Sequence, residues 1–125
     1  MSVKAISKGV SLSPRKVGVV ADLVRGRSVN DALVILNNTP RRAAGAVAKT
    51  IVSAKSNADY NHNYKPDSLK IIEITVNHGV RTKRFRMAAM GRALPYQKRK
   101  SHITVIVDGE KRQPKKSTAK SEGAK

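Results

Sequence analysis

The sequence has 125 residues, which is enough for one domain and too few for two. Its 26 Lys and Arg residues outnumber 8 Asp and Glu, and the formal net charge is +18. This excess is typical of proteins that bind polyanions, because contacts to phosphates release condensed counterions. The absence of cysteine excludes disulfides, thiolate zinc sites and thiol catalysis. No apolar run reaches the roughly 18 residues that cross a bilayer, so we expect a cytoplasmic protein with no membrane partner.

The N-terminal segment combines an extended arm with a first helix. Residues 3–12 alternate imperfectly, with apolar side chains at even positions, which predicts a strand-like arm. Ser13 and Pro14 are typical of an N-cap followed by the first helical residue, and Gly26 is placed to end that helix. Helical spacing predicts a buried face of Val17, Val20, Ala21 and Val24.

Two more helices are predicted before the middle of the chain. The second begins with Ser28 as its N-cap and is broken by the asparagines at 37–38. The pair at 39–40, Thr-Pro, repeats the cap-plus-proline start and predicts a longer third helix that runs to about Ala58. The expected buried residues are Ala32, Leu33, Ile35 and Leu36 in the second helix and Ala44, Val47, Ala48, Ile51, Val52 and Ala58 in the third.

The second half of the chain changes from helical to alternating periodicity. Residues 59–68 are polar and contain Pro66, so they predict a loop. Two later segments, 69–80 and 101–107, alternate apolar and polar residues as half-buried strands do. Their apolar positions are Ile72, Ile74 and Val76 in the first and Ile103, Val105 and Val107 in the second.

The connection between these two strands is long and purely cationic. No acidic residue lies between Glu73 and Asp108. If both strands simply continue outward, the tip stands roughly 35 Å from the body, and such an isolated two-stranded ribbon is marginal in water. Its like charges favour a ribbon inserted into folded RNA; a solvated loop and a membrane-inserting loop are the alternatives. The basic residues are Arg81, Lys83, Arg84, Arg86, Arg92, Lys98, Arg99 and Lys100.

The remaining features give no sign of catalysis. His62, His78 and His102 lack metal-ligand spacing, although the last two could face each other across the paired strands. The few acidic residues are mostly isolated, and no phosphate-binding glycine motif occurs. We therefore expect no enzyme activity, no metal and no cofactor. The last segment, 111–125, contains six Lys or Arg residues and one acidic residue, and it predicts a disordered basic tail.

Four short motifs stand out along the chain: SPRK at 13–16, ADLVRG at 21–26, GRA at 91–93 and SHITV at 101–105. In this order they resemble the bacterial large-subunit ribosomal protein L twenty-two family, over residues 3–110. The resemblance implies an α+β fold with three helices packed on a small antiparallel sheet and a long protruding β-hairpin. It implies one domain over 1–110, with the hairpin at 78–102.

The resemblance also implies a function and partners. Members bind large-subunit rRNA during early assembly, and their hairpin lines the polypeptide exit tunnel. There it approaches ribosomal protein L four and the passing nascent chain. Carried over to this sequence, the eight basic residues between the strands are expected to contact rRNA. Weaker candidates lie on the body: Arg15, Lys16, Arg25 and Arg27.

The expected tunnel tip departs from the family pattern. Many members have Pro-Arg-Ala where this chain has Met87, Ala88 and Ala89, followed by Met90 and Gly91. Losing the proline frees a backbone angle, and losing the arginine removes a charge. We therefore expect this tip to rely on apolar contact from its methionines. An architectural DNA-binding protein is the alternative function, because it shares the charge and the basic ribbon.

Overall fold

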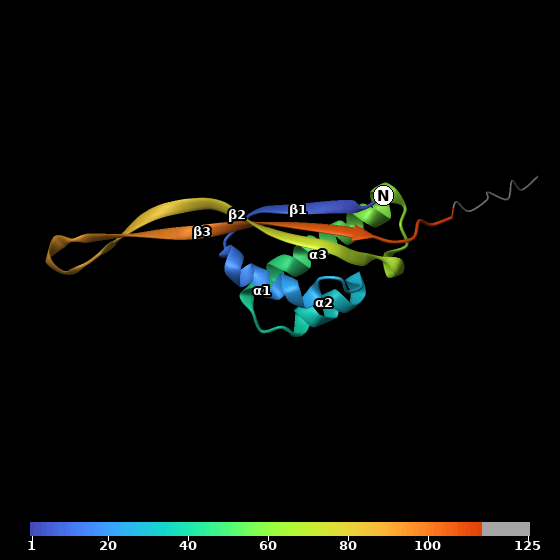
Figure 1. Ribbon diagram of the computed structural model, residues 1–125, viewed down its shortest axis with the longest axis horizontal. Helices are drawn as coiled ribbons and strands as arrows, with labels where there is room; N and C mark the ends of the chain where they lie inside the picture. The colour runs from blue at the N-terminus through green and yellow to red at the C-terminus, as the bar shows by residue number, and fades with distance from the viewer. Residues whose placement is uncertain (114–125) are drawn as a thin grey trace, which may run out of the picture.

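The computed structural model describes residues 1–113, and it joins one helical layer to one antiparallel sheet (Figure 1). The strands lie in the order β1-β3-β2, and the hairpin of β2 and β3 projects far beyond the helices. This arrangement confirms the predicted α+β fold. The elements are β1 (Val3–Val10), α1 (Pro14–Val24), α2 (Val29–Asn38), α3 (Arg42–His62), the 3-10 turn η1 (Pro66–Ser68), β2 (Lys70–Met87), the 3-10 turn η2 (Ala89–Gly91) and β3 (Ala93–Asp108).

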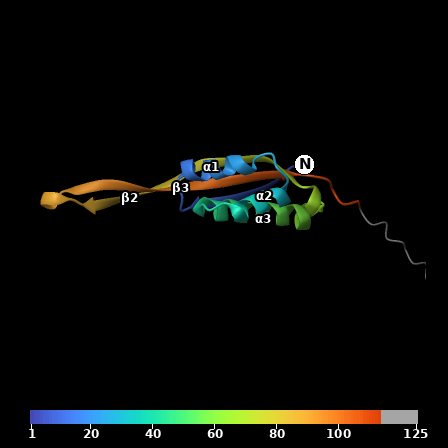
Figure 2. The same cartoon turned by 90° about the horizontal axis from the view of Figure 1, so that it is seen from below.

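The three helices all cover the same face of the sheet. α1 packs mainly on β2, and α3 packs on β1 and β3. Figure 2, seen from below, shows α1 along one margin of the sheet and α3 along the other. α2 packs on α3 and lies farther from the strands. Because all three helices sit at one end, they leave both faces of the distal hairpin uncovered.

The core is aliphatic, as the scarcity of aromatic residues requires. The buried face of α1 is the predicted one, and so is the inward face of β3 with Ile103, Val105 and Val107. In α2, Ala32 and Leu36 are buried, whereas Leu33 and Ile35 are only partly buried. The largest buried side chain is the aromatic ring of Tyr64. The Ser28 hydroxyl accepts a hydrogen bond from the Asp31 amide at 3.3 Å, which confirms the predicted N-cap of α2.

The start and end of α3 differ from the prediction. The Thr39 hydroxyl donates to the Ile35 carbonyl at 2.7 Å, so this threonine closes α2 instead of capping α3. α3 begins at Arg42 and continues through the first part of the predicted loop to His62. It ends there because the next residue, Asn63, adopts a left-handed conformation with φ of 55°.

Four of the six residues predicted to be buried in α3 are buried, namely Ala44, Val47, Ile51 and Ala58, and two are not. Val52 is about half exposed and Ala48 only partly buried, whereas Thr50 and Ala54 are buried in the core. Thr50 tolerates burial because its hydroxyl donates to the Ala46 carbonyl at 3.0 Å.

The alternation predicted the core-facing residues of two strands only in part. In β2, Ile74 is buried and Val76 is partly buried, as predicted. In β2 the register shifts between Ile71 and Glu73, so Ile71 is buried while Ile72 is about half exposed. A β-bulge adds one residue to one strand and therefore moves the preceding side chains to the other face. In β1, Val3 and Ala5 are buried, whereas Ile6 is about half exposed. Lys4, Ile6 and Lys8 therefore face outward, whereas Val10 and Leu12, beyond the irregularity that follows Ser7, are partly buried against the core.

The chain remains on the body for some residues after β3. The Arg112 amide donates to the Asn63 carbonyl at 2.7 Å, and its guanidinium lies 2.7 Å from the Asp59 carboxylate. The Lys111 ammonium lies over the Tyr64 ring, 5.9 Å from its centre. From residue 114 onward, the basic tail predicted for 111–125 lies outside the described residues. Over residues 1–113, no helix is long and apolar enough to cross a membrane.

Candidate nucleic-acid interface

The distal part of the β2–β3 hairpin forms a ribbon that starts at a second irregularity in the pairing. The register shifts between His78 and Arg81, and regular pairing then runs outward from Arg81 with Arg99 to Met87 with Ala93. We call this segment, residues 79–101, the ribbon. At about 3.3 Å per residue, its outward strand extends roughly 30 Å, close to the length predicted.

Gly79 determines how closely the two strands approach where the ribbon leaves the body. A Cβ atom at this position would lie 2.9 Å from the backbone carbon and oxygen of Lys100. Real Cβ atoms do not approach backbone that closely, so any side chain here forces the two strands apart. The glycine therefore allows the bulge that turns the ribbon away from the body.

The pairing register divides the ribbon into two faces, because directly opposed residues point to the same side of a sheet. One face is cationic near the body and apolar near the tip, and we call it the apolar-tipped face. The other carries basic residues along its whole length, and we call it the cationic face. The apolar-tipped face holds Arg81, Lys83, Phe85 and Met87 with Arg99, Gln97, Pro95 and Ala93; the cationic face holds Thr82, Arg84 and Arg86 with Lys98, Tyr96 and Leu94.

The ribbon has no internal compensation for its charge. Among the residues described, all three ion pairs lie on the body, and none involves a ribbon residue. Arg81 and Arg99 stand directly opposite each other, an arrangement that is destabilising in water because like charges repel. On the cationic face, the Arg86 guanidinium lies 5.6 Å from the centre of the Tyr96 ring. The predicted basic side chains thus lie on both faces and at the tip of the ribbon, which has no acidic residue to balance their charge.

The tip is a tight turn with two strongly exposed methionines. Met90 and Gly91 both have positive φ, 62° and 70°, and the Ala88 amide donates to the Arg92 carbonyl at 2.8 Å. Met87 is 94% exposed and Met90 97% exposed. Exposure this large is unfavourable for apolar side chains in water. It is consistent with a tip that contacts something other than its own chain.

The four basic residues predicted on the body fall into two groups. Arg25 is held by its own fold: its guanidinium contacts the Asp22 carboxylate at 2.5 Å and donates to the Ile74 carbonyl at 3.0 Å. Arg27 similarly donates to the Leu23 carbonyl at 3.1 Å, at the end of α1. The other two, Arg15 and Lys16 at the start of α1, are exposed.

The histidines do not come together. His102 pairs with Asn77 in the register, so it lies on the opposite face from His78. The prediction that these two could face each other is therefore wrong, because the strand register differs by one residue from that expectation. The His102 ring nitrogen Nδ1 accepts a hydrogen bond from the Gly9 amide at 3.0 Å, which ties β1 to β3. No cluster of three or more metal-ligating side chains occurs in residues 1–113.

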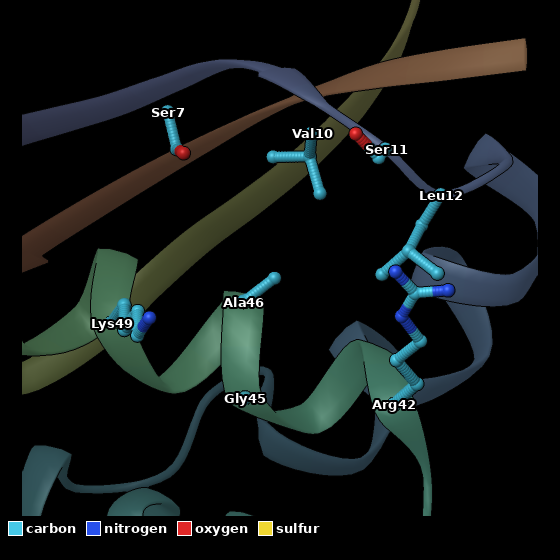
Figure 3. Close-up of a pocket in the computed structure, with 8 residues that line it drawn as sticks. All are labelled: Ser7, Val10, Ser11, Leu12, Arg42, Gly45, Ala46 and Lys49. Atoms are coloured by element: carbon cyan, nitrogen blue, oxygen red, sulfur yellow. The ribbon is translucent and has the colours of Figure 1, made fainter.

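Sequence reasoning missed a second cationic surface on the body, a groove between β1 and α3 (Figure 3). Its central part is open to solvent and has a volume of about 370 Å³. Two smaller hollows extend it, one sharing Leu12 and Arg42, the other sharing Ser7 and Lys49. The spacing of Arg42 and Lys49 by two helical turns was the available signal. We call this the body groove; its central part is lined by Ser7, Val10, Ser11, Leu12, Arg42, Gly45, Ala46 and Lys49.

Comparison with known proteins explains the combination of a small body and a cationic ribbon. Residues 5–108 match the family described as ribosomal protein L22p/L17e. The chain belongs to this family. The match includes the whole ribbon and its tip, and it confirms the resemblance found in the sequence motifs.

The relatives within the ribosomal protein L22p/L17e family are similar along nearly their entire length. The large ribosomal subunit protein uL22 of Clostridioides difficile is 50% identical over 111 residues, which cover 89% of this chain and 100% of the relative. The protein of the same name from Oceanobacillus iheyensis is 49% identical over 111 residues, covering 89% and 98%. The chain is accordingly a ribosomal protein of the large subunit.

Proposed function

We propose that this protein is a structural, non-enzymatic component of the large ribosomal subunit that binds rRNA through its ribbon. Its binding assists early subunit assembly, and the ribbon tip forms part of the wall of the polypeptide exit tunnel. The observation that carries the proposal is the projecting ribbon, whose cationic side chains have no acidic partner of their own. The proposed rRNA contacts are Arg81, Lys83, Arg84, Arg86, Arg92, Lys98, Arg99 and Lys100, with Arg15, Lys16, Arg25 and Arg27 as further contacts on the body.

The physical reason for RNA binding is that the ribbon is unstable when no polyanion surrounds it. An isolated two-stranded ribbon is marginally stable at best in water, and the opposed Arg81 and Arg99 add repulsion. Phosphates along both faces replace repulsion with charge-assisted hydrogen bonds. The two rows of strand residues suit rRNA that surrounds the ribbon on more than one side. Arg25 and Arg27 are weaker contacts, since intramolecular bonds already occupy their guanidinium groups.

The tip has a different set of proposed partners. Its exposed methionines, Met87 and Met90, make apolar contacts. Many members carry proline in place of Met87 and arginine in place of Ala88. The proposed neighbours are ribosomal protein L four and the nascent chain, which passes residues 87–91. A map of the ribosome with both methionines packed on rRNA or protein supports this assignment, whereas two side chains loose in the tunnel lumen contradict it.

The decisive experiment is a competition between RNA and DNA for the full chain. Labelled large-subunit rRNA is bound at several salt concentrations and competed with unlabelled duplex DNA. Eight phosphate contacts give a slope of log K against log salt of about −6 to −7. We expect DNA to compete only at large excess. Equal competition by duplex DNA favours an architectural DNA-binding protein, which also uses basic β-ribbons, and overturns the proposal.

A further inference from the structure

We infer that the body groove binds one unstacked nucleotide of the RNA, with the base on its apolar floor and the flanking phosphates at Arg42 and Lys49. The inference rests on the proposed rRNA binding and adds a second, shape-specific site to it. The ribbon offers charge along an extended rod, whereas the groove offers an open hollow with an apolar floor. The two surfaces therefore read different features of the same RNA.

The floor of the groove has the chemistry of a base-binding surface. Val10, Leu12 and Ala46 are partly buried and pack against the core, so they form a fixed apolar surface. Gly45 adds no side chain, and a Cβ atom there would meet nothing within 4 Å. The groove is open to solvent, and its volume of about 370 Å³ is within the range of small-ligand sites, roughly 300–1,000 Å³.

The rim of the groove has the chemistry of a phosphate-binding surface. Arg42 and Lys49 border its central part from α3, and Arg41 and Lys16 border the adjoining hollow. None of these four residues forms an ion pair within residues 1–113. No acidic side chain lines any of the three hollows. The hydroxyl of Ser7 lies in the groove as well, where it can bond a ribose or a base edge (Figure 3).

The position of the groove links it to the ribbon. Val10 pairs with Ser101 of β3, which itself pairs with His78 where the ribbon leaves the body. The pairing of β1 is irregular between Ser7 and Val10, and such irregularities re-aim neighbouring side chains. An RNA strand that follows the ribbon toward the body therefore arrives at the Val10 end of the groove.

A nucleotide suits this groove better than a protein segment does. An apolar floor with a purely cationic rim matches a base attached to phosphates, and proteins recognise RNA mainly by capturing unstacked bases of loops and bulges. An acidic peptide shares the charge, but it fills the space above Gly45 with a flat group only if an aromatic residue lies beside its acidic residues, whereas every nucleotide joins a flat base to a phosphate. The structure thus favours RNA, and a protein occupant becomes an outcome of the test.

The test fills the groove without changing any charge. Gly45→Leu places a side chain over the floor, and replacing a glycine inside a helix favours helix formation. Gly18→Leu is the matched control, because Gly18 also lies inside a helix and outside the three hollows, and a Cβ atom added there would meet nothing within 4 Å. Thermal unfolding followed by circular dichroism verifies that both variants fold.

Full-length proteins are bound to deproteinised large-subunit rRNA, which is probed with base-modifying reagents. We expect wild type and Gly18→Leu to protect at least one unpaired base that stays reactive with Gly45→Leu, and the affinity of Gly45→Leu to be about ten-fold lower. In the double variant Arg42→Ala, Lys49→Ala, the salt slope should fall by about 1.4.

Three outcomes overturn the inference, and they are distinguishable from failure of the proposed function. If Gly45→Leu and wild type bind rRNA with equal affinity and protect the same bases, the groove holds no nucleotide, although rRNA binding itself is intact. Normal rRNA binding by Gly45→Leu combined with poor incorporation into the subunit assigns the groove to a protein neighbour. Loss of affinity in the charge variant alone, with no base protected, reduces the groove to a patch of surface charge. If wild type itself ignores rRNA, the proposed function fails along with it.

Discussion

Gly79 is the residue on which the direction of the ribbon depends. Replacing it with alanine brings a methyl group within 2.9 Å of the Lys100 backbone, which must shift. We expect Gly79→Ala to lower the free energy of unfolding by about 1–3 kcal/mol, measured by urea denaturation. Gly18→Ala is the control and should raise it by up to about 1 kcal/mol, since that residue lies inside α1 with open space around it. Equal effects of the two substitutions on the free energy of unfolding contradict the close approach of Gly79 to the Lys100 backbone.

Tyr64 couples the N-terminus to the end of the sheet and makes stability depend on pH. Burial raises the pKa of its hydroxyl, and the nearby Asp108 carboxylate raises that pKa further. The hydroxyl also donates to the Met1 carbonyl. The folded protein therefore holds this proton more tightly than the unfolded chain does. The resulting stability is complete below pH about 10, the ordinary pKa of tyrosine, and is lost as the pH rises through the folded pKa.

The pH dependence is measured as the fall in melting temperature between pH 9 and pH 11. We expect Tyr64→Phe to show a smaller fall than wild type, because phenylalanine has no proton to lose. Tyr60→Phe is the matched control, since the Tyr60 side chain is 82% exposed, and it should behave as wild type. A Tyr64→Phe variant that loses as much stability as wild type contradicts the assignment.

At the scale of elements, sequence patterns predicted which segments fold and failed where backbone irregularities intervene. The regular alternation of Ile103, Val105 and Val107 identified the inward face of β3 correctly. The same rule failed at Ile72, because the bulge beside it shifts the register by one residue. Thr39 is of a residue type that often serves as an N-cap, yet its hydroxyl donates a hydrogen bond to a carbonyl of the preceding helix. Local propensity cannot distinguish these cases, since tertiary packing decides between them.

The bulge in β2 makes a prediction about two adjacent isoleucines of the same size. Ile71→Ala should cost about 2–5 kcal/mol of stability, because Ile71 is 1% exposed and its removal leaves a cavity. Ile72→Ala should change stability by less than about 1 kcal/mol, because that side chain is 54% exposed. Chemical denaturation of the two variants measures the difference. Equal costs, or a larger cost for Ile72, contradict the register.

For the whole molecule, the sequence revealed the charge of the ribbon but not the body groove. The basic residues of the ribbon lie close together in the sequence, and the absence of acidic residues between Glu73 and Asp108 is visible in it directly. The groove instead joins Ser7 and Leu12 to Arg42 and Lys49, which meet only when α3 packs beneath β1. Its residues are ordinary when taken one by one. A site assembled from distant segments requires the packed structure, whereas a site on one hairpin does not.

The proposed function depends above all on the ribbon charges binding rRNA within the subunit. Its most direct test is the incorporation of the triple variant Arg84→Glu, Arg92→Glu, Arg99→Glu, measured as the fraction that cosediments with the large subunit in a gradient. The control reverses three charges elsewhere on the body: Lys4→Glu, Lys55→Glu and Lys70→Glu. We predict that the ribbon variant keeps the melting temperature of wild type but no longer cosediments with the large subunit. The control variant should still cosediment. Undiminished cosedimentation of the ribbon variant would contradict the proposed function.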